Sequence, residues 1–487
     1  MATAEILSLH PQDVWGHFHA LTQIPRPTGH TKEVMRFMVE FGKKLNLETL
    51  QDKTGNVLIK KPATKGYENA KTVILQGHLD MVPQKNSDVQ HDFLKDAIET
   101  TVNGEWVSAC STTLGADDGI GCALIMAVLA DPSLQHPPIE ALFTVDEEVG
   151  MVGANGIEKG FLSGTMLINL DTEEDGELCI GCAGGRDVNV TFRYKPDTEI
   201  DKGDVAYKIS LRGLKGGHSG TQIHLGRANA NKLMNRFLKE VVADYEARIA
   251  GIQGGSLRNA IPRESFVVLT IPEQLSEDLE DLVNEYETLF REDFAGIEEG
   301  ISFKAERTEL PKSLIPEEIQ DDLIHAVEGC PNGVMSYLAD LPDVVESSLN
   351  LALVESTEGC IEVKLLVRSS SESRKDWVCS ATESVFLLAG AKVAFDDDYS
   401  GWQPNADSEL LNIMERVYLE KFGERPKVIV IHAGLECGII QSKVDQKLDI
   451  VSFGPTIIGA HSPQETVNIA SVQKNYDYLI AILEQLK

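Results

Sequence analysis

Basic side chains and long apolar segments are scarce in this chain of 487 residues. Its 44 lysines and arginines stand against 76 aspartates and glutamates, so the formal net charge is −32. This acidic balance argues against nucleic acid and against an anionic membrane surface as partners. No apolar run reaches the roughly 18–20 residues that a membrane helix needs, so we expect no transmembrane segment.

The chain also lacks a leader pattern and a cysteine framework. Its first residues, MATAEILSLHPQDVWGHF, contain no basic segment followed by an apolar core, as a secretory signal would. Among the cysteines, Cys179 and Cys182 alone form a CxxC pair, and no second pair accompanies them to build a structural zinc site. We interpret these two cysteines as small residues flanking a glycine turn, and we expect a reduced, cytoplasmic protein.

The length predicts more than one domain, because single hydrophobic cores stop growing at about 250–300 residues. Up to about residue 186, short apolar runs alternate with helical patterns. Helices are expected at 11–24, 31–45 and 119–132, and strands at 56–59, 72–76, 141–145 and 166–170. Such alternation is typical of an α/β fold with a mostly parallel sheet and helices on both faces.

A different pattern follows, in which the strands look amphipathic and antiparallel. One set has strands at 188–194, 207–211 and 265–271 and helices at 227–247 and 277–291. A second set in similar order has helices at 317–327 and 373–389 and strands at 347–354, 361–368 and 392–395. We interpret this region as an α+β domain in which one kind of lobe is used twice.

The alternating pattern returns near the C-terminus, with helices at 406–422 and 470–486 and strands at 427–431 and 449–453. The simplest account is a discontinuous main domain, residues 1–186 and 398–487, with the α+β domain, residues 187–397, inserted as a lid.

Metal-ligand side chains follow several of the apolar strands. The segments are TVILQGHLDMVP with His78 and Asp80, STTLGADDGIG with Asp117 and Asp118, ALFTVDEEVG with Glu147 and Glu148, MLINLDTEEDG with Asp171, and IVSFGPTIIGAHSPQE with His461. Each signal is weak by itself, since a strand-end histidine or an acidic loop is usually structural. Because sites in open parallel sheets form at the carboxyl ends of strands, the segments are expected to converge on one crevice.

The combination indicates a metal site. Two imidazoles and three carboxylates suit zinc, and a shared carboxylate can bridge two ions. Asp80 lies two residues beyond His78 and would hold its imidazole in the right tautomer. Of the pair Glu147 and Glu148, one can bind metal while the other acts as a base.

These motifs resemble the co-catalytic zinc aminopeptidases and carboxypeptidases, which include the carnosinase-like dipeptidases. HLDMVPQKN, GADDGIG, FTVDEEVGMVGA and NLDTEEDGELCIGCAGG look most like the bacterial aminoacyl-histidine dipeptidase branch. The likeness covers essentially the whole chain. It implies a zinc-exopeptidase-like fold, two zinc ions that cobalt or manganese could replace, and hydrolysis of Xaa-His dipeptides by a water between the ions.

The resemblance also implies roles for individual residues. One ion would be bound by His78, Asp117 and Asp171, and the other by Asp117, Glu148 and His461. Glu147 would be the general base, Asp80 would orient His78, and Asp118 would be a neighbour rather than a ligand. In the lid, His218 of LRGLKGGHSG would close on the reacting carbonyl.

Further residues are candidates for reading the substrate. By resemblance, Arg368 would clamp the C-terminal carboxylate of the substrate, since a guanidinium matches that group bidentately. Asn259 would donate to the peptide or to its carboxylate. Glu436 of HAGLECG would bind the free amino end, because a carboxylate pairs with an ammonium group, although a structural turn explains this segment nearly as well.

Two other functions stay open. An N-acyl-amino-acid amidohydrolase would use the same machinery, and a non-catalytic metal-binding scaffold would keep the fold without activity. Retention of Glu147 beside all five ligand positions argues against the scaffold. The oligomeric state, homodimer or monomer, is open too. The length of the lid suggests that one chain supplies His218 to its own site.

Overall fold

The computed structural model describes residues 5–339, 341–405 and 407–487, and the chain divides into two compact units. The first unit contains the residues up to Cys182, Trp402–Val430 and Leu435–Lys487. The second contains Ala183–Gly401 and the short segment Ile431–Gly434. The chain thus leaves the first unit within a few residues of the boundary expected from the sequence. The return of Ile431–Gly434 to the second unit was not expected.

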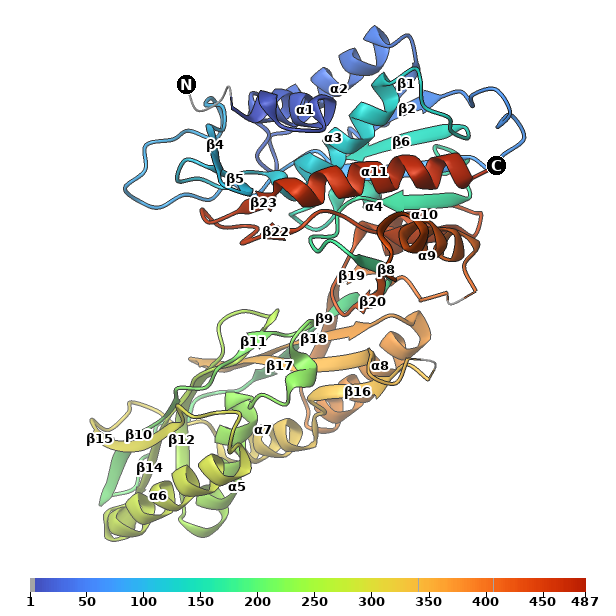
Figure 1. Cartoon of the computed structure of the whole chain (residues 1–487). Helices are drawn as coiled ribbons and strands as arrows, with labels where there is room; N and C mark the ends of the chain where they lie inside the picture. The colour runs from blue at the N-terminus through green and yellow to red at the C-terminus, as the bar shows by residue number, and fades with distance from the viewer. Residues whose placement is uncertain (1–4, 340, 406) are drawn as a thin grey trace. The chain divides into compact units, whose positions relative to one another are not determined.

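The first unit is built on a large sheet (Figure 1) with the strand order β1-β2-β6-β3-β7-β21-β8-β20. Its strands are β1 (Glu48–Gln51), β2 (Val57–Lys61), β3 (Val73–His78), β6 (Ile139–Thr144), β7 (Met166–Asn169), β8 (Glu177–Cys182), β20 (Lys427–Ile431) and β21 (Asp449–Ser452). The central strands β6, β3, β7 and β21 run parallel, whereas β1, β2 and β8 pair antiparallel at the flanks. The predicted α/β fold is confirmed, and the sheet is mixed with a parallel centre.

The helices of this unit are α1 (Gln12–Thr22), α2 (Lys32–Lys44), α3 (Ala116–Ala130), α4 (Val152–Gly156), α9 (Glu409–Phe422), α10 (Glu436–Lys443) and α11 (Ile469–Gln485). The helix expected from residue 406 begins at Glu409, and residue 406 itself lies outside the described residues. A smaller sheet has the order β22-β23-β5-β4, with β4 (Thr100–Asn103), β5 (Trp106–Ala109), β22 (Ile457–Ile458) and β23 (Thr466–Asn468). No helix in the described residues is long and apolar enough to cross a membrane.

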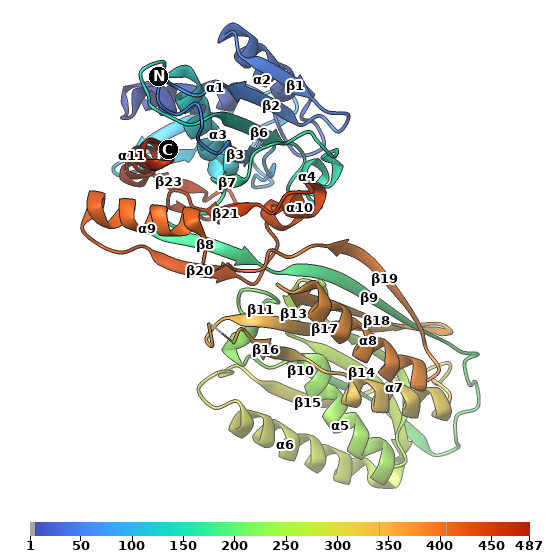
Figure 2. The same ribbon diagram turned by 90° about the vertical axis from the view of Figure 1, so that its right-hand side faces the viewer.

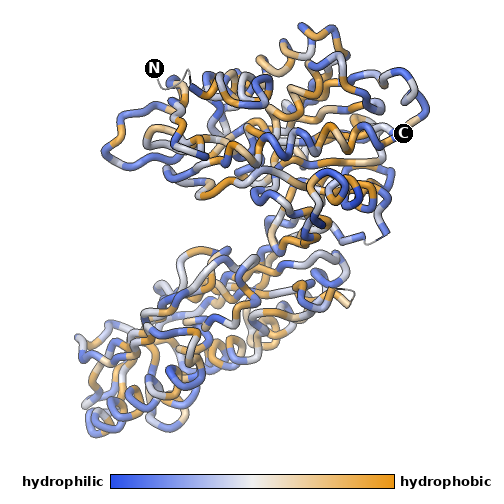
Figure 3. Tube along the Cα trace, in the orientation of Figure 1, coloured by the Kyte–Doolittle hydropathy of each residue, from blue (hydrophilic) through white to orange (hydrophobic). Residues whose placement is uncertain are grey.

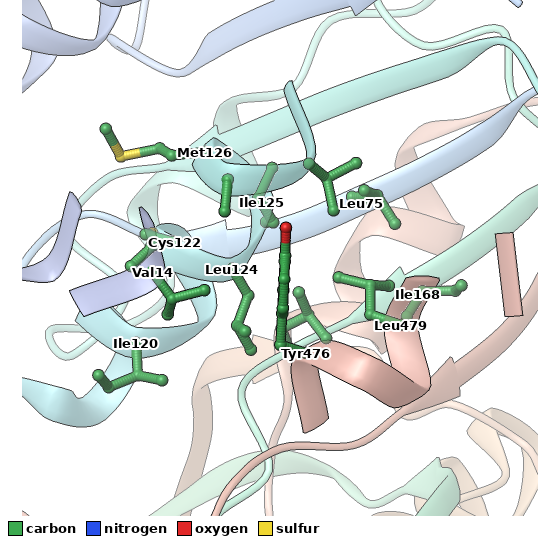
Figure 4. Packing of buried hydrophobic residues seen from close by; sticks show 14 of the residues in the cluster. Val14, Leu75, Ile120, Cys122, Leu124, Ile125, Met126, Ile168, Tyr476 and Leu479 are labelled. Atoms are coloured by element: carbon green, nitrogen blue, oxygen red, sulfur yellow. The ribbon is translucent and has the colours of Figure 1, made fainter. Parts of the chain in front are cut away.

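Alternate residues of the central strands face opposite sides of the large sheet. On one side, Leu75 of β3 and Ile168 of β7 pack with Leu124 of α3 and Leu479 of α11 (Figure 4). Figure 3 shows hydrophobic residues, in orange, alternating with hydrophilic ones, in blue, along the chain. The intervening residues of the strands face the other side, where α4 and α10 pack together (Figure 2).

The CxxC pair lies within β8 and not in a turn, so that part of the interpretation is wrong. Both cysteines are buried, and the backbone of Cys182 pairs with that of Trp402. Gly181 is closely covered by Pro404 and by the Trp402 carbonyl. The segment ELCIGC is therefore a buried strand whose small residues allow close packing.

The second unit has its own sheet, with the order β15-β10-β14-β12-β17-β18-β9-β19 and with β16 paired to β17. Its strands are β9 (Gly184–Arg193), β10 (Asp204–Arg212), β12 (Arg248–Gly254), β14 (Ser265–Pro272), β15 (Ser302–Thr308), β16 (Gly333–Tyr337), β17 (Val345–Thr357), β18 (Cys360–Ser369) and β19 (Lys392–Tyr399). The helices α5 (Ala230–Asp244), α6 (Ser276–Asp293), α7 (Glu317–Gly329) and α8 (Glu372–Leu388) gather on one face of this sheet (Figure 2). A pair of short strands, β11 (Gly217–His218) and β13 (Ala260–Ile261), lies apart from it.

This sheet contains the same arrangement twice. The elements β10-α5-β12-β14-α6-β15 and β9-α7-β17-β18-α8-β19 follow the same order of strand and helix. The four strands of each lobe are numbered here in chain order. Read from the outer edge of the sheet inwards, they lie in the order fourth, first, third, second, and the two lobes meet where β12 pairs with β17. The first lobe is inserted between β9 and α7 of the second.

Candidate active site

Metal-type side chains of the first unit meet at the carboxyl end of its parallel strands. His78 ends β3, Glu147 and Glu148 follow β6, Asp171 follows β7, Asp117 lies at the start of α3, and His461 lies in the loop between β22 and β23. Parallel strands place their ends on one edge of a sheet, and this edge is where open α/β folds bind ligands.

Asp117 lies between two groups of ligand atoms. Its Oδ1 is 3.1 Å from Nε2 of His78, and that nitrogen is 3.3 Å from Oδ1 of Asp171. Its Oδ2 is 3.1 Å from Nε2 of His461, and that nitrogen is 3.0 Å from Oε1 of Glu148. Each oxygen of Asp117 therefore faces a different imidazole and a different carboxylate.

The chemistry and spacing of these donors fit two divalent metal ions. Ligand atoms about 2.0–2.2 Å from one tetrahedral zinc ion lie about 3.3–3.6 Å from each other, close to the spacing in both groups. His78, Asp117 and Glu148 also offer atoms that all lie within 4.8 Å of one another. Burial and the neighbouring carboxylates raise the pKa of Asp171 to about 6 and that of Glu147 well above its usual range.

Asp80 is fully buried and organises the loop that follows β6. Its Oδ1 accepts from the backbone N–H of Glu147 at 3.0 Å, and its Oδ2 accepts from the hydroxyl of Thr28 at 2.9 Å. Nδ1 of His78 lies 3.6 Å from Oδ1 of Asp80, beyond a normal hydrogen bond. Burial would raise the pKa of Asp80, but His78 and these donors hold it at about 2. Asp80 therefore lies between the imidazole of His78 and the backbone of Glu147.

Asp118 lies behind the ligands. Its Oδ2 accepts from the backbone N–H of His78 at 3.1 Å, and a cis peptide bond joins it to Asp117. A Cβ atom at Gly77 or Gly121 would collide with its carboxylate, so glycine at both positions leaves the room that Asp118 occupies.

Two buried residues that the sequence analysis missed fix the loop of Asp117. Glu465 accepts from four successive backbone N–H groups, those of residues 114–117, at 2.7–3.3 Å. Arg26 donates to the carbonyl oxygens of Leu79 and Asp80, at 2.9 and 3.0 Å, and also to that of Gly115. Glu465 follows His461 closely in the sequence and could have been considered for that reason. No local signal marks Arg26.

Glu436 lies under the site with none of its surface exposed. Its Oε2 accepts from Nε2 of Gln76 at 2.6 Å and from the hydroxyl of Thr144 at 2.5 Å. Its Oε1 is buried and has no partner among the described residues. A substrate amine would reach this carboxylate only if the surrounding side chains moved.

In the second unit, the structure brings His218 and Asn259 together. The short strands that carry them pair, and Ser219 donates its N–H to the carbonyl of Asn259 at 2.8 Å. Nδ1 of His218 accepts from the backbone N–H groups of Gly220 and Thr221, each at 3.1 Å. In the neutral ring the proton is therefore on Nε2, which is left as a donor.

Arg368 lies beside His218 in the same unit. A Cβ atom at Gly220 would be 3.0 Å from Cε1 of His218 and 3.2 Å from Nε of Arg368. Arg368 is 5% exposed, and its guanidinium donates to the hydroxyl of Tyr399 at 2.9 Å, but its buried Nε has no hydrogen-bond partner in the part of the chain that the structure describes. Burial and the charge of Arg368 lower the pKa of His218, which keeps this imidazole neutral near pH 7.

His432, from the segment that returns to the second unit, was not selected from the sequence. Its Nε2 lies 2.7 Å from the hydroxyl of Ser348, and its carbonyl lies against Gly220. Burial, with the charge of Arg368, lowers the pKa of His432 to about 3. The neutral ring therefore helps to hold the loop of His218.

Comparison with known proteins agrees with this arrangement. The model of peptidase family M20/M25/M40 matches residues 74–485. The cytosol non-specific dipeptidase of Escherichia coli is 42% identical over 484 residues, which cover 99% of each chain. The crystal structure of aminoacylhistidine dipeptidase from Vibrio alginolyticus is 44% identical and has a TM-score of 0.93, with 99% of this chain and 98% of that chain covered.

More distant structures share the fold. An aminopeptidase PepT from Bacillus cereus has a TM-score of 0.58 at 15% identity, over 98% of this chain and 99% of that chain. The family match covers most of the chain, and the two relatives above align along nearly its whole length. The chain belongs to peptidase family M20/M25/M40.

Proposed function

We propose that this chain is a cytoplasmic, metal-dependent dipeptidase that hydrolyses Xaa-His dipeptides and other dipeptides. The observation that carries the proposal is the position of Asp117, whose two oxygens face two separate pairs of an imidazole and a carboxylate. The relatives from Escherichia coli and Vibrio alginolyticus are named as dipeptidases, which supports a dipeptide substrate, and the first is named as a cytosol enzyme, which supports the compartment.

The residues present would hold two ions. His78, Asp117 and Asp171 would bind one, and Asp117, Glu148 and His461 would bind the other. When bound, two zinc ions would supply a polarised scissile carbonyl and a water whose pKa is lowered towards about 7. Cobalt or manganese could take their place, because imidazole and carboxylate ligands accept several divalent metals.

Glu147 is the proposed general base. It lies in the loop after β6 and belongs to neither ligand group, so its carboxylate is free to take a proton from water and return it to the leaving amine. Asp80 supports this role, because it holds the backbone N–H of Glu147. General acid–base catalysis of this kind contributes roughly 10²–10⁴-fold to a rate.

The second unit would supply the groups that bind the peptide. Nε2–H of His218 would donate to the developing oxyanion, and its Nδ1 is already held by backbone N–H groups. The buried guanidinium of Arg368, which pairs with no carboxylate among the described residues, would bind the C-terminal carboxylate of the dipeptide. Asn259 would donate to the peptide from the loop paired with that of His218.

The test is to measure bound zinc together with a panel of substrates. Zinc-loaded enzyme should hydrolyse dipeptides, including carnosine, and chelation should abolish that activity. Turnover of N-acetyl amino acids without turnover of dipeptides would favour the amidohydrolase instead. A protein without activity at any zinc loading would be a scaffold.

The origin of His218 can be tested by mixing inactive variants. We propose that each chain supplies His218 to its own site, because the doubled lobe of the second unit lengthens the lid. Mixed H218A and E147A chains should then stay inactive. Recovery of activity would show that His218 acts across subunits and that the active form is at least a dimer.

A further inference from the structure

A row of buried polar side chains runs across the large sheet just below the candidate ligands. Gln76 of β3, Asn169 of β7 and Ser452 of β21 are register partners, and Thr144 ends β6. Gln76 precedes His78 by two residues, as Asn169 precedes Asp171, and Thr144 leads into the loop of Glu147. Any shift in this row would move the strand ends that carry the site.

Glu436, the first residue of α10, connects this row to the helical layer. It accepts from Gln76 and Thr144, and Gln76 also donates to the Thr144 hydroxyl at 3.2 Å. Asn169 in turn donates its Nδ2 to Oε1 of Gln76 at 2.6 Å. Oδ1 of Asn169 accepts from the backbone N–H of Asp171 at 3.3 Å and from the hydroxyl of Ser452. A continuous path of hydrogen bonds therefore leads from Glu436 to a candidate ligand.

The carboxylate sets the direction of this path. Oε2 of Glu436 accepts from both of its neighbours, so Gln76 turns its NH₂ towards Glu436 and its oxygen towards Asn169. Asn169 must then turn its own NH₂ towards Gln76, which leaves its oxygen for the backbone of Asp171. A neutral apolar residue at position 436 would leave both amides free to rotate, with buried donors unpaired.

We propose that Glu436 is a positioning residue that fixes the strand ends carrying His78, Glu147 and Asp171 through Gln76, Thr144 and Asn169. The inference rests on the proposed function, since it assigns the metal site as what is positioned. It differs from the role expected from the sequence, in which Glu436 binds the substrate amine. Its complete burial and its two short contacts favour the positioning role.

The experiment compares E436A and E436Q with wild type. E436A should weaken zinc binding about 10–100-fold, the usual effect of losing a group that supports metal ligands, and should lower kcat. KM for a dipeptide should change less than about twofold, since no contact to substrate is removed. E436Q should keep its zinc affinity and its kcat within about threefold of wild type, because its amide oxygen can accept from both Gln76 and Thr144. Zinc affinity is measured by chelator competition, well below the unfolding temperature.

Glu140 provides the matched control. It is 2% exposed, lies on β6, pairs with Lys60 at 3.2 Å, and accepts from the hydroxyl of Ser163 at 2.6 Å and from the N–H of Gly164 at 2.9 Å, but it lies near the opposite end of the strand. E140A should lower the unfolding temperature as E436A does, yet keep zinc affinity within about twofold of wild type. Equal losses of zinc affinity in the two variants would mean that the effect is general destabilisation, which overturns the proposal.

Two further results would overturn it. One is wild-type zinc affinity in E436A with a raised KM only for substrates that have a free amino group, which would restore the amine-binding role. If E436A does not fold, T144V removes one donor and leaves Glu436 in place; unchanged zinc affinity in T144V would then contradict the proposal. Failure of the proposed function is distinguishable, because wild type itself would bind no zinc or hydrolyse no dipeptide.

Discussion

The candidate sites of the two units differ in the sign of the side chains that no lysine, arginine or carboxylate of the described residues pairs with. In the first, Asp117, Glu148 and Asp171 contact imidazoles, and no lysine or arginine among the described residues forms an ion pair with them. In the second, the buried Arg368 has a hydroxyl partner and no carboxylate within the described chain. Buried charges are costly unless they are paired, which is the reason for proposing a ligand of opposite sign in each unit.

The difference assigns separate tasks to the two units. Cations suit the first unit, and the anionic end of a peptide suits the second. Both buried groups that fix the Asp117 loop, Arg26 and Glu465, bond to backbone and so leave the charge of the ligands unneutralised. Substitutions in the first unit should therefore act on metal and turnover, and those in the second on recognition.

The largest effect is expected for Asp117→Ala. Both proposed ions share this carboxylate, so the variant should lose at least one of them and its turnover should fall to background. Zinc content after dialysis measures the loss. Asp146→Asn is the control, because Asp146 lies outside both ligand groups and accepts from the N–H of Gly29 at 2.8 Å. Full zinc content in Asp117→Ala would contradict the shared role.

Glu147→Gln should lower kcat by roughly 10²–10⁴-fold, the range for loss of a general base. Zinc content should stay close to wild type, because Glu147 is not a proposed ligand. Steady-state kinetics and metal analysis on the same preparation measure both. Loss of both ions in this variant would move Glu147 into the ligand set and leave the base unassigned.

Arg368→Ala tests the recognition side of the comparison. Loss of a charge-assisted contact should reduce kcat/KM for dipeptides about 10–100-fold. The same dipeptides with an amidated C-terminus should be poor substrates of wild type. Their kcat/KM should fall little further in the variant. Zinc content should not change. An equal loss for both kinds of substrate would argue that Arg368 supports the fold rather than the carboxylate.

The smallest effect concerns pH and His432. Its pKa is about 3 in the folded protein against an ordinary value of 6.5, so the unfolded chain binds more protons between these values. Stability is then lost as the pH falls below about 6.5, by about 2 kcal/mol at pH 5. Between pH 7.5 and 5, the free energy of unfolding measured in urea should therefore fall by about 2 kcal/mol less in His432→Gln than in wild type. Parallel pH profiles for the two proteins would contradict the assignment.

The sequence predicted the elements and the ligand candidates where the signal was local. His78 ends β3, Glu148 and Asp171 come shortly after β6 and β7, and Asp117 lies at the start of α3 after a glycine. Strand ends of a parallel sheet lie together, so their convergence followed from the pattern. The flanking strands β1 and β8 gave no such signal, and the mixed character of the sheet was not foreseen.

What the sequence could not give depends on contacts between distant segments. Glu465 bonds to residues 114–117, and Glu436 bonds to Gln76, each across several hundred positions. A glutamate that will be buried looks the same in sequence as one on the surface, so Glu436 could be assigned only by its charge. The CxxC segment was misread for a similar reason. Its close neighbours, Trp402 and Pro404, are distant in the sequence, because the main segment of the second unit separates them from it.

The central claim is that Asp117 is shared by two metal ions in the first unit. Titration of the metal-free protein with zinc, followed calorimetrically, tests it most directly. Wild type should bind two ions per chain, and Asp117→Asn should bind fewer or bind both far more weakly. A wild-type stoichiometry of one, or two ions bound with equal affinity by wild type and Asp117→Asn, would contradict the claim.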